Sequence, residues 1–174
     1  HGAHWIAGVG GGSVMDIAKA CAGLLEAPRP VEAYHEGEPI ETSRIPFIAV
    51  PSTAGTGSES TIVTVLTSTR AGVKKSIRHP SFMARLVVLD PDLLVSCPPS
   101  VVAASGMDAF TQAIEAYTSI HATWFSDQHA LKAVELINRS IERVQDGGGD
   151  EGSRQDLLQG SYLAGVALSN ARLG

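Results

Sequence analysis

Cysteine is scarce in this chain of 174 residues, which holds only Cys21 and Cys97, far apart and in no C-x-x-C pair. Such sparse cysteine excludes a disulfide framework and a zinc site built from thiolates, and it favours a reducing compartment. No apolar run approaches the ~20 residues that a membrane-spanning helix needs. A charged segment followed by an apolar one, as in a signal peptide, is also missing from the start. We therefore expect a cytoplasmic protein with no membrane partner.

Positive charge is in short supply as well. The chain has 13 Lys and Arg against 18 Asp and Glu, which gives a net charge of −5 with its six His neutral. Without a basic surface, a nucleic-acid partner is not expected. Hydrophobic residues make up 44% of the chain and charged residues 18%. This is the composition of a globular protein, and the length suffices for a sizeable core.

Short apolar runs alternate with a helical pattern in the first half of the chain. Residues 4–9 end at a glycine run and are followed by apolar residues at helical spacing from Val14 to Leu25. Residues 46–53 and 84–90 form two more apolar runs, and 61–68 with 74–77 alternate enough to form a hairpin or paired edge strands. Residues 31–45 read as a polar connection. Continuous apolar strands that alternate with a helix predict a parallel α/β sheet.

The second half of the chain reads as helix throughout. Helices are predicted at 99–119, 127–144 and 153–170, with Ser126 and Ser153 as N-caps and a capping box between Ser153 and Asp156. We place the boundary near Cys97, with a partial α/β domain at 1–97 and a partial all-α domain at 98–174. Because the chain begins almost inside a strand–turn–helix unit, we expect a piece of a longer protein that associates into a homo-oligomer.

A glycine-rich turn, "VGGGSVMD", joins the first strand to the first helix. Glycines let backbone N–H groups approach an anion, and a helix N-terminus adds partial positive charge, as in a pyrophosphate site. The spacing is not G-x-G-x-x-G. Ser13 can bond an N–H of the first turn or donate to a phosphate. An ordinary capping box between Ser13 and Asp16 is the alternative, since the two stand three residues apart.

A second loop, "VPSTAGTGSES" at 50–60, also follows a buried strand. Thr53, Thr56 and Ser58 offer hydroxyls there, and the intervening glycines allow close backbone approach. Ligands of parallel sheets bind at the carboxyl ends of the strands, so the two loops together predict a nucleotide cleft. The alternative is a polar turn whose hydroxyls satisfy its own backbone.

"GMDAFTQAIEA" places Asp108 and Gln112 four residues apart in a predicted helix, hence on one face. A carboxylate early in a helix ordinarily stabilises the helix dipole. It can also be half of a metal site, but the amide of Gln112 offers only a neutral oxygen where iron or zinc favours imidazole.

Taken together, "GGGSVMDIAKA", "PSTAGTGSES", "LDPDLLVSCPPSVVAASGMDAFTQAIEAY" and "GSYLAGVALSNARLG" resemble the iron-containing, or group III, alcohol dehydrogenase family. The resemblance implies the dehydroquinate synthase-like architecture, with an α/β nucleotide-binding domain followed by a helical domain. It also implies NAD or NADP and a divalent metal, iron or zinc, in the cleft between them. The implied reaction transfers a hydride between an alcohol and the cofactor to give an aldehyde or ketone.

The resemblance also implies roles for single residues. The pyrophosphate would lie on Gly11, Gly12 and Ser13, with Asp16 beside them. The rest of the cofactor would contact Thr53, Thr56, Lys74 at the ribose and Val101 near the nicotinamide. Asp108 matches the first metal ligand, and Gln112 stands where the family commonly has a histidine. The family's remaining histidine ligands would follow Gly174, so the isolated chain is expected to be inactive and to hold no tightly bound transition metal.

Three other functions stay open at this point. One is a reductase on the same fold that uses no metal, with polar side chains in its place. Another is a lyase of the dehydroquinate synthase kind, against which "TAGTGSE" and "GMDAFTQAIEAY" favour the dehydrogenase. The last is a non-catalytic fragment that only binds a nucleotide.

Overall fold

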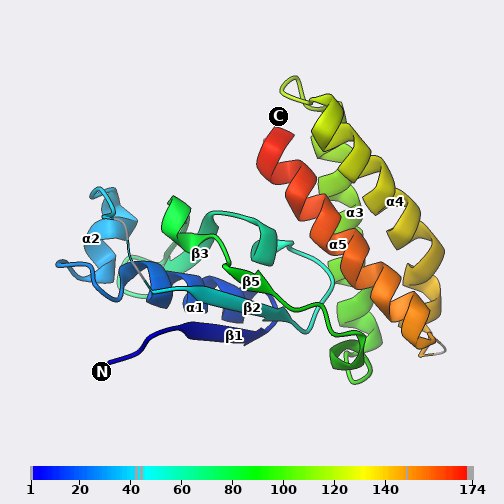
Figure 1. Ribbon diagram of the computed structural model, residues 1–174, viewed down its shortest axis with the longest axis horizontal. Coiled ribbons are helices and arrows are strands. Elements are labelled where there is room, and N and C mark those ends of the chain that lie inside the picture. Colours follow the sequence, from blue (N-terminus) through cyan, green and yellow to red (C-terminus); the bar gives the residue numbers. More distant parts are fainter. Residues whose placement is uncertain (1, 42, 44, 148, 172–174) are drawn as a thin grey trace.

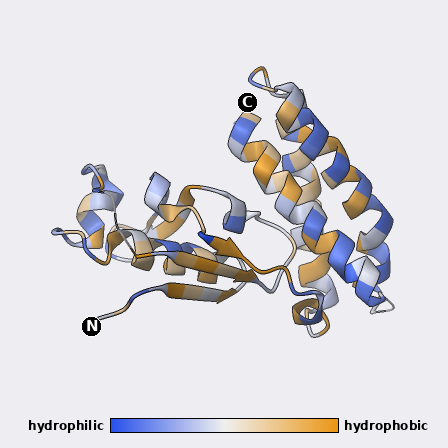
Figure 2. Cartoon of the chain, in the orientation of Figure 1, coloured by the Kyte–Doolittle hydropathy of each residue, from blue (hydrophilic) through white to orange (hydrophobic). Residues whose placement is uncertain are grey.

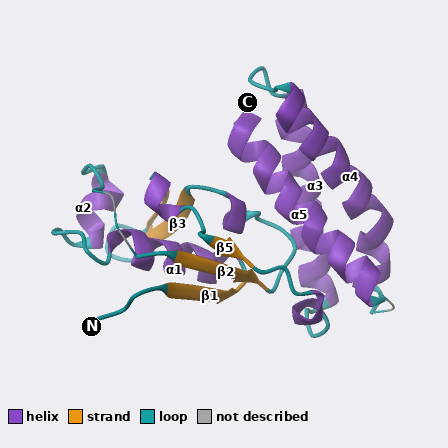
Figure 3. Cartoon of the chain, viewed as in Figure 1, coloured by secondary structure: helices purple, strands orange, loops and turns teal. Residues whose placement is uncertain are grey.

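The computed structural model describes residues 2–41, 43, 45–147 and 149–171. A small sheet region occupies one end of the molecule and a group of three long helices the other (Figures 1 and 3). The strands are β1 (Ile6–Gly10), β2 (Phe47–Pro51), β3 (Val63–Ser68), β4 (Val73–Arg78) and β5 (Leu86–Val87). The α-helices are α1 (Gly12–Leu24), α2 (Val31–Glu36), α3 (Pro99–Thr118), α4 (Trp124–Gln145) and α5 (Glu151–Ala171), and three short 3-10 turns, η1 (Ser58–Ser60), η2 (Pro80–Phe82) and η3 (Pro91–Leu94), connect them.

The predicted parallel sheet is confirmed. Its strand order is β1-β2-β5, with Ile6 opposite Phe47 and Ala49 opposite Val87. β5 is shorter than the predicted run at 84–90, because it pairs only with β2 in the described part of the chain. β3 and β4 form the expected antiparallel hairpin.

α1 presents a different face to the sheet from the one its largest apolar residues suggest. Met15, Ala18 and Ala22 pack against Phe47 and Ala49, whereas three larger residues of the predicted apolar pattern are exposed: Val14, Ile17 and Leu25. The periodicity could not choose between the faces, because both carry apolar side chains. Alanines on the inner face let the helix lie close to the strands.

The predicted polar connection at 31–45 was wrong in part, because it contains α2. Pro30 stands at the N-cap position of this short helix, and Gly37, at φ 115°, ends it with its N–H donated to the carbonyls of Ala33 and Tyr34. Tyr34 is buried against Leu24, Ile77 and Phe82. α2 thereby covers the hairpin from the side of α1.

The predicted caps of the last two helices were wrong by three residues. Thr123 is the N-cap of α4, and its hydroxyl accepts from the Ser126 N–H at 3.2 Å while Ser126 Oγ accepts from the Thr123 N–H at 2.8 Å. At α5 the Asp150 carboxylate accepts from the Ser153 N–H at 2.7 Å. Asp156 does not complete a capping box, since its carboxylate pairs with the Arg139 guanidinium at 2.7 Å.

The three long helices pack closely because small residues line their contacts. Fully buried alanines recur on all three: Ala109, Ala113, Ala116, Ala130, Ala133, Ala164, Ala167 and Ala171. Figure 2 shows apolar residues along the strands and as stripes on the helices. No helix in the described ranges is long and apolar enough to cross a bilayer. The division into domains at residue 97 stays a prediction, and residues 55–60 make contacts across it with α3 and α5.

Candidate functional site

The glycine turn leaves the start of α1 free of a side-chain cap within the described residues. Gly11 is the N-cap, with extended backbone, and its carbonyl accepts from the Val14 and Met15 N–H groups. The alternative of a capping box between Ser13 and Asp16 is therefore wrong. A helix start of this kind presents its first N–H groups to an anion.

The loop after β2 lies against this turn. A methyl group added at Gly11 would come within 3.2 Å of Thr53 Oγ1, and one at Gly12 within 2.8 Å of Thr56 Cγ2. The Ser52 N–H also donates to the Gly10 carbonyl at 2.9 Å. The prediction that the two loops lie together at one edge of the sheet is confirmed, and a methyl group at position 12 would force the Thr56 side chain to move.

Residues of α1 hold the far end of this loop. Asp16 accepts from Ser58 Oγ at 2.8 Å and from the Val65 N–H at 3.1 Å. Lys19 is fully buried, and its ammonium donates to the carbonyls of Thr61 (3.0 Å) and Val63 (2.8 Å) and to the Thr61 hydroxyl (3.0 Å). Both carboxylate oxygens of Asp16 thus hold protein groups.

Two buried ionisable groups, Lys19 and Glu59, lie near enough here for their charges to interact. Burial lowers the pKa of Lys19 to about 8, against the opposing charges of Asp16 and Glu59. Burial raises the pKa of Glu59, whose backbone hydrogen bond and the Lys19 charge act in the other direction. Sequence reasoning singled out neither residue. The sequence did offer one indication for Lys19, because it follows Asp16 by one turn on the same helix face and stands next to apolar positions.

The same loop touches two of the long helices and so joins the sheet region to the helical region. A methyl group at Gly55 would lie 2.6 Å from Ser105 Cβ on α3, and one at Gly57 would lie 2.7 Å from the Cα of Gly165 on α5. Ser169 Oγ donates to the Ser60 carbonyl at 3.0 Å. We call this contact of residues 55–60 with α3 and α5 the seam.

Asp108 and Gln112 lie on α3 beyond the seam and share one face, as predicted. Gln112 Nε2 donates to Asp108 Oδ2 at 2.8 Å. An ionised carboxylate only accepts hydrogen bonds, so the amide must turn its nitrogen toward Asp108 and its oxygen away. Gln112 Oε1 is then buried with no hydrogen-bond partner among the described residues. Leaving such an acceptor unpaired costs ~1–3 kcal/mol, which marks the position for a donor.

The other predicted site residues are exposed to solvent. Ser13 and Thr56 are exposed at the two loops, and Lys74 is exposed on β4 opposite Thr67. Val101 lies in the first turn of α3 and is exposed. The structure records no contact that joins Lys74 or Val101 to the loops within its described residues, so their roles stay predictions.

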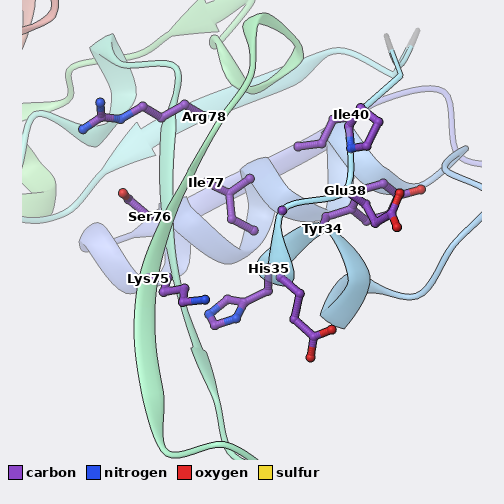
Figure 4. A pocket seen from close by; sticks show the side chains of 11 residues that line it. Tyr34, His35, Glu38, Ile40, Lys75, Ser76, Ile77 and Arg78 are labelled. Atoms are coloured by element: carbon purple, nitrogen blue, oxygen red, sulfur yellow. The ribbon is translucent and has the colours of Figure 1, made fainter.

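A groove of about 400 Å³ lies elsewhere, between α2 and β4. Figure 4 shows Tyr34, His35 and Ile40 on one side of it and Lys75 and Ile77 on the other. None of the predicted site residues lines this groove. It is therefore separate from the two loops and from Asp108.

The described residues do not by themselves fit a transition metal. They contain no group of three or more His, Cys, Asp or Glu side chains placed to hold one. Asp108 and Gln112 offer one carboxylate and one amide, already hydrogen-bonded to each other. Iron or zinc usually needs three or four protein ligands and favours imidazole.

Comparison with known protein families gives two matches that together cover most of the chain. Residues 1–91 match the model "Iron-containing alcohol dehydrogenase", and residues 102–174 match "Fe-containing alcohol dehydrogenase family, C-terminal".

Among curated proteins, the chain is 43% identical over 166 residues to "Probable alcohol dehydrogenase EutG" of Salmonella typhimurium, a match that covers 95% of the chain and 42% of that protein. It is 35% identical over 166 residues to the "NAD-dependent methanol dehydrogenase" of Bacillus methanolicus, covering 95% of the chain and 44% of that protein. The chain thus spans less than half the length of these relatives.

Solved structures give the same result as the family models and the curated proteins. Sulfoacetaldehyde reductase from Bifidobacterium kashiwanohense, solved in complex with NAD+, superposes with a TM-score of 0.92 at 33% identity and covers 98% of this chain and 46% of its own. An iron-containing alcohol dehydrogenase from Thermococcus thioreducens superposes with a TM-score of 0.90 at 35% identity and covers 99% and 47%.

Proposed function

Since this chain belongs to the iron-containing alcohol dehydrogenase family, we propose that it is the central part of an oxidoreductase that transfers a hydride between an alcohol, or the matching aldehyde or ketone, and NAD or NADP. One observation carries the proposal: the uncapped glycine turn of α1 lies in contact with the threonine loop after β2. Backbone N–H groups and hydroxyls at the carboxyl ends of parallel strands form the usual surroundings of a nucleotide pyrophosphate.

Each loop has its own task in this proposal. Gly11, Gly12 and Ser13 bind the pyrophosphate through the open N-terminus of α1, and the Thr53 and Thr56 hydroxyls bind along the cofactor. When bound, the nicotinamide supplies or accepts the hydride, while the protein fixes its orientation. Lys74 and Val101 are proposed to contact the ribose and the nicotinamide side.

Asp108 and Gln112 are proposed to bind the substrate at the reacting end. Gln112 Oε1 is a buried acceptor without a partner among the described residues, so a substrate hydroxyl can donate to it only after the side chain shifts. The neutral amide in place of an imidazole favours a second candidate, a reductase on the same fold that uses no metal. The two candidates share the cofactor site and differ in whether a metal is bound beside Asp108.

We further propose that the complete protein is a cytoplasmic homo-oligomer that acts on a small alcohol or aldehyde. Both cysteines are free thiols, in line with a reducing compartment. Large apolar side chains are exposed on both regions, among them Trp5, Ile17, Ile120 and Trp124, which suits burial by further chain or by another copy.

The cofactor site is tested with two matched glycine substitutions in the complete protein. Gly12→Ala places a methyl group 2.8 Å from Thr56, whereas Gly152→Ala, in the first turn of α5, meets only Asp150 Oδ1 at 3.6 Å. We expect Gly12→Ala to weaken NAD(H) binding by about tenfold in a fluorescence titration and Gly152→Ala to leave it unchanged. Equal affinities in all three proteins, or no oxidation of NADH or NADPH by any aldehyde, would overturn the proposal.

A further inference from the structure

Lys19 is a fully buried cation that the proposed reaction does not use. All three protons of its ammonium are directed at the protein, to the Thr61 carbonyl and hydroxyl and to the Val63 carbonyl. Burying a charge is costly unless it is paired and hydrogen-bonded. Because all three hydrogen bonds go to residues 61–63, the role of the lysine is to hold this short segment in place.

The segment held by Lys19 is the far end of the threonine loop. The near end of that loop is fixed where the Ser52 N–H donates to the Gly10 carbonyl. Asp16, one turn before Lys19, adds bonds to Ser58 Oγ and to the Val65 N–H. Residues 53–57 are thus fixed at both ends, with α1 holding the far end.

The glycines that face Thr53 and Thr56 begin the same helix. Gly11 and Gly12 stand at its first turn, and Lys19 lies about two turns further on. One rigid element therefore presents the N–H groups of the first loop and fixes the position of the second. The charged groups that act on Lys19 are Asp16 on α1 and Glu59 in the 3-10 turn η1.

We infer that Lys19 is a positioning residue for the cofactor: it holds residues 58–63 so that Thr53 and Thr56 stay against Gly11 and Gly12. This inference rests on the proposed function, because the two loops bind the cofactor only in that proposal. Lys19 acts through the loop and touches no ligand itself. Removing its ammonium would leave the buried Thr61 carbonyl and the partly buried Val63 carbonyl without these bonds.

The test uses three variants of the complete protein. Lys19→Met keeps the length of the side chain without its donors, and Lys19→Arg keeps donors. Thr64→Val is the matched control, because Thr64 is equally buried and donates to the Asp16 carbonyl at 2.6 Å, but lies beyond the loop. The measurements are the NAD(H) dissociation constant, the KM and kcat values, the melting temperature, and hydrogen exchange of amides 53–58.

For Lys19→Met we expect NAD(H) binding about tenfold weaker, a KM for the cofactor that rises more than kcat falls, and faster exchange at 53–58. Lys19→Arg restores most of the affinity. Thr64→Val lowers the melting temperature but leaves the dissociation constant within about twofold. Unchanged affinity in Lys19→Met, or an equal loss in Thr64→Val, would overturn the inference.

Two further outcomes are separable. If Lys19→Met does not fold, Thr61→Val removes one of the three acceptors and is expected to show the same changes at smaller size; no change in it would contradict the inference. If the unmodified protein binds neither NAD nor NADP, the proposed function fails. The holding of the loop by Lys19 is then decided by amide exchange, where unaltered rates at 53–58 would reject it.

Discussion

At the scale of single residues, Gln112 is where this chain departs from the pattern that its resemblance implies. Its amide nitrogen is committed to Asp108, and its oxygen lies buried and unpaired within the described residues. To ligate a metal through that oxygen beside Asp108, the amide would have to give up the bond to the carboxylate. An imidazole is also the better ligand, because iron and zinc favour its nitrogen over a neutral amide oxygen.

We therefore expect Gln112→His to raise the affinity of the complete protein for iron or zinc by about tenfold or more. The matched control is Thr111→His, which adds the same imidazole one position earlier on an exposed face of α3. Elemental analysis and metal titration of the purified proteins check this. An affinity equal to that of the unmodified protein would contradict the metal-site interpretation of Asp108 and position 112.

Lys19 gives stability a pH dependence with a definite sign. Burial lowers its pKa from 10.5 to about 8, so between these values the unfolded chain binds more protons at this position than the folded chain. Its contribution to the free energy of unfolding is fully present above pH 10.5 and is lost as the pH falls through 8. The slope for one proton cannot exceed ~1.4 kcal/mol per pH unit.

Urea unfolding of the unmodified protein and of Lys19→Met, from pH 8 to 10.5, isolates this contribution. The stability of the unmodified protein minus that of the variant should rise with pH, since methionine does not titrate. A difference that is flat or falls across the window would mean that Lys19 is not held charged in a buried site.

A site residue could be predicted where a short stretch of sequence was enough to mark it, and it was missed where its environment depends on distant residues. Asp108 and Gln112 were found because a spacing of four in a helix fixes a shared face. Gly11 and Gly12 were found because the glycine run is contiguous. Lys19 and Glu59 were missed, because their burial depends on residues 42 or more positions away in the sequence or on the packing of η1.

At the scale of elements, the parallel strands and long helices were predictable, and their ends and inner faces were not. The continuous apolar runs predicted β1 and β2 without any tertiary information. The buried face of α1 could not be predicted, because the exposed side carries Val14 and Ile17 and the inner side carries Met15 and alanines. The caps were displaced because Thr123 and Asp150, three residues before the predicted caps, are equally good capping residues.

At the scale of the whole molecule, the seam is what makes a sheet region and a helical region one site. Gly57 and Gly165 bring the threonine loop and α5 to backbone contact, and Gly55 does the same against Ser105 of α3. Each glycine looks like an ordinary loop or helix residue in the sequence. Only the meeting of positions 50 or more residues apart shows why no side chain fits there.

The seam leads to a last prediction, for Gly165→Ala in the complete protein. The added methyl group would lie 2.7 Å from the Gly57 carbonyl oxygen and 2.9 Å from its Cα, and would also meet Ser60 Oγ. Because backbone atoms cannot rotate away as a side chain does, the loop must shift from α5. We expect a loss of ~1–3 kcal/mol in the free energy of unfolding together with weaker NAD(H) binding, since the same loop carries Thr53 and Thr56.

Gly152→Ala makes the same chemical change in the same helix where space is open, and it should leave both quantities unchanged. Adding Ser60→Ala to Gly165→Ala removes the contact with the hydroxyl, and with it the bond that this hydroxyl donates to the Gly57 carbonyl, so it should not restore cofactor affinity while the Gly57 backbone remains in the way. Calorimetry and a fluorescence titration measure the two quantities. If Gly165→Ala lowered the stability but left the cofactor affinity unchanged, the prediction would be wrong. The loop could then move away from α5 while its threonines stay against the glycine turn.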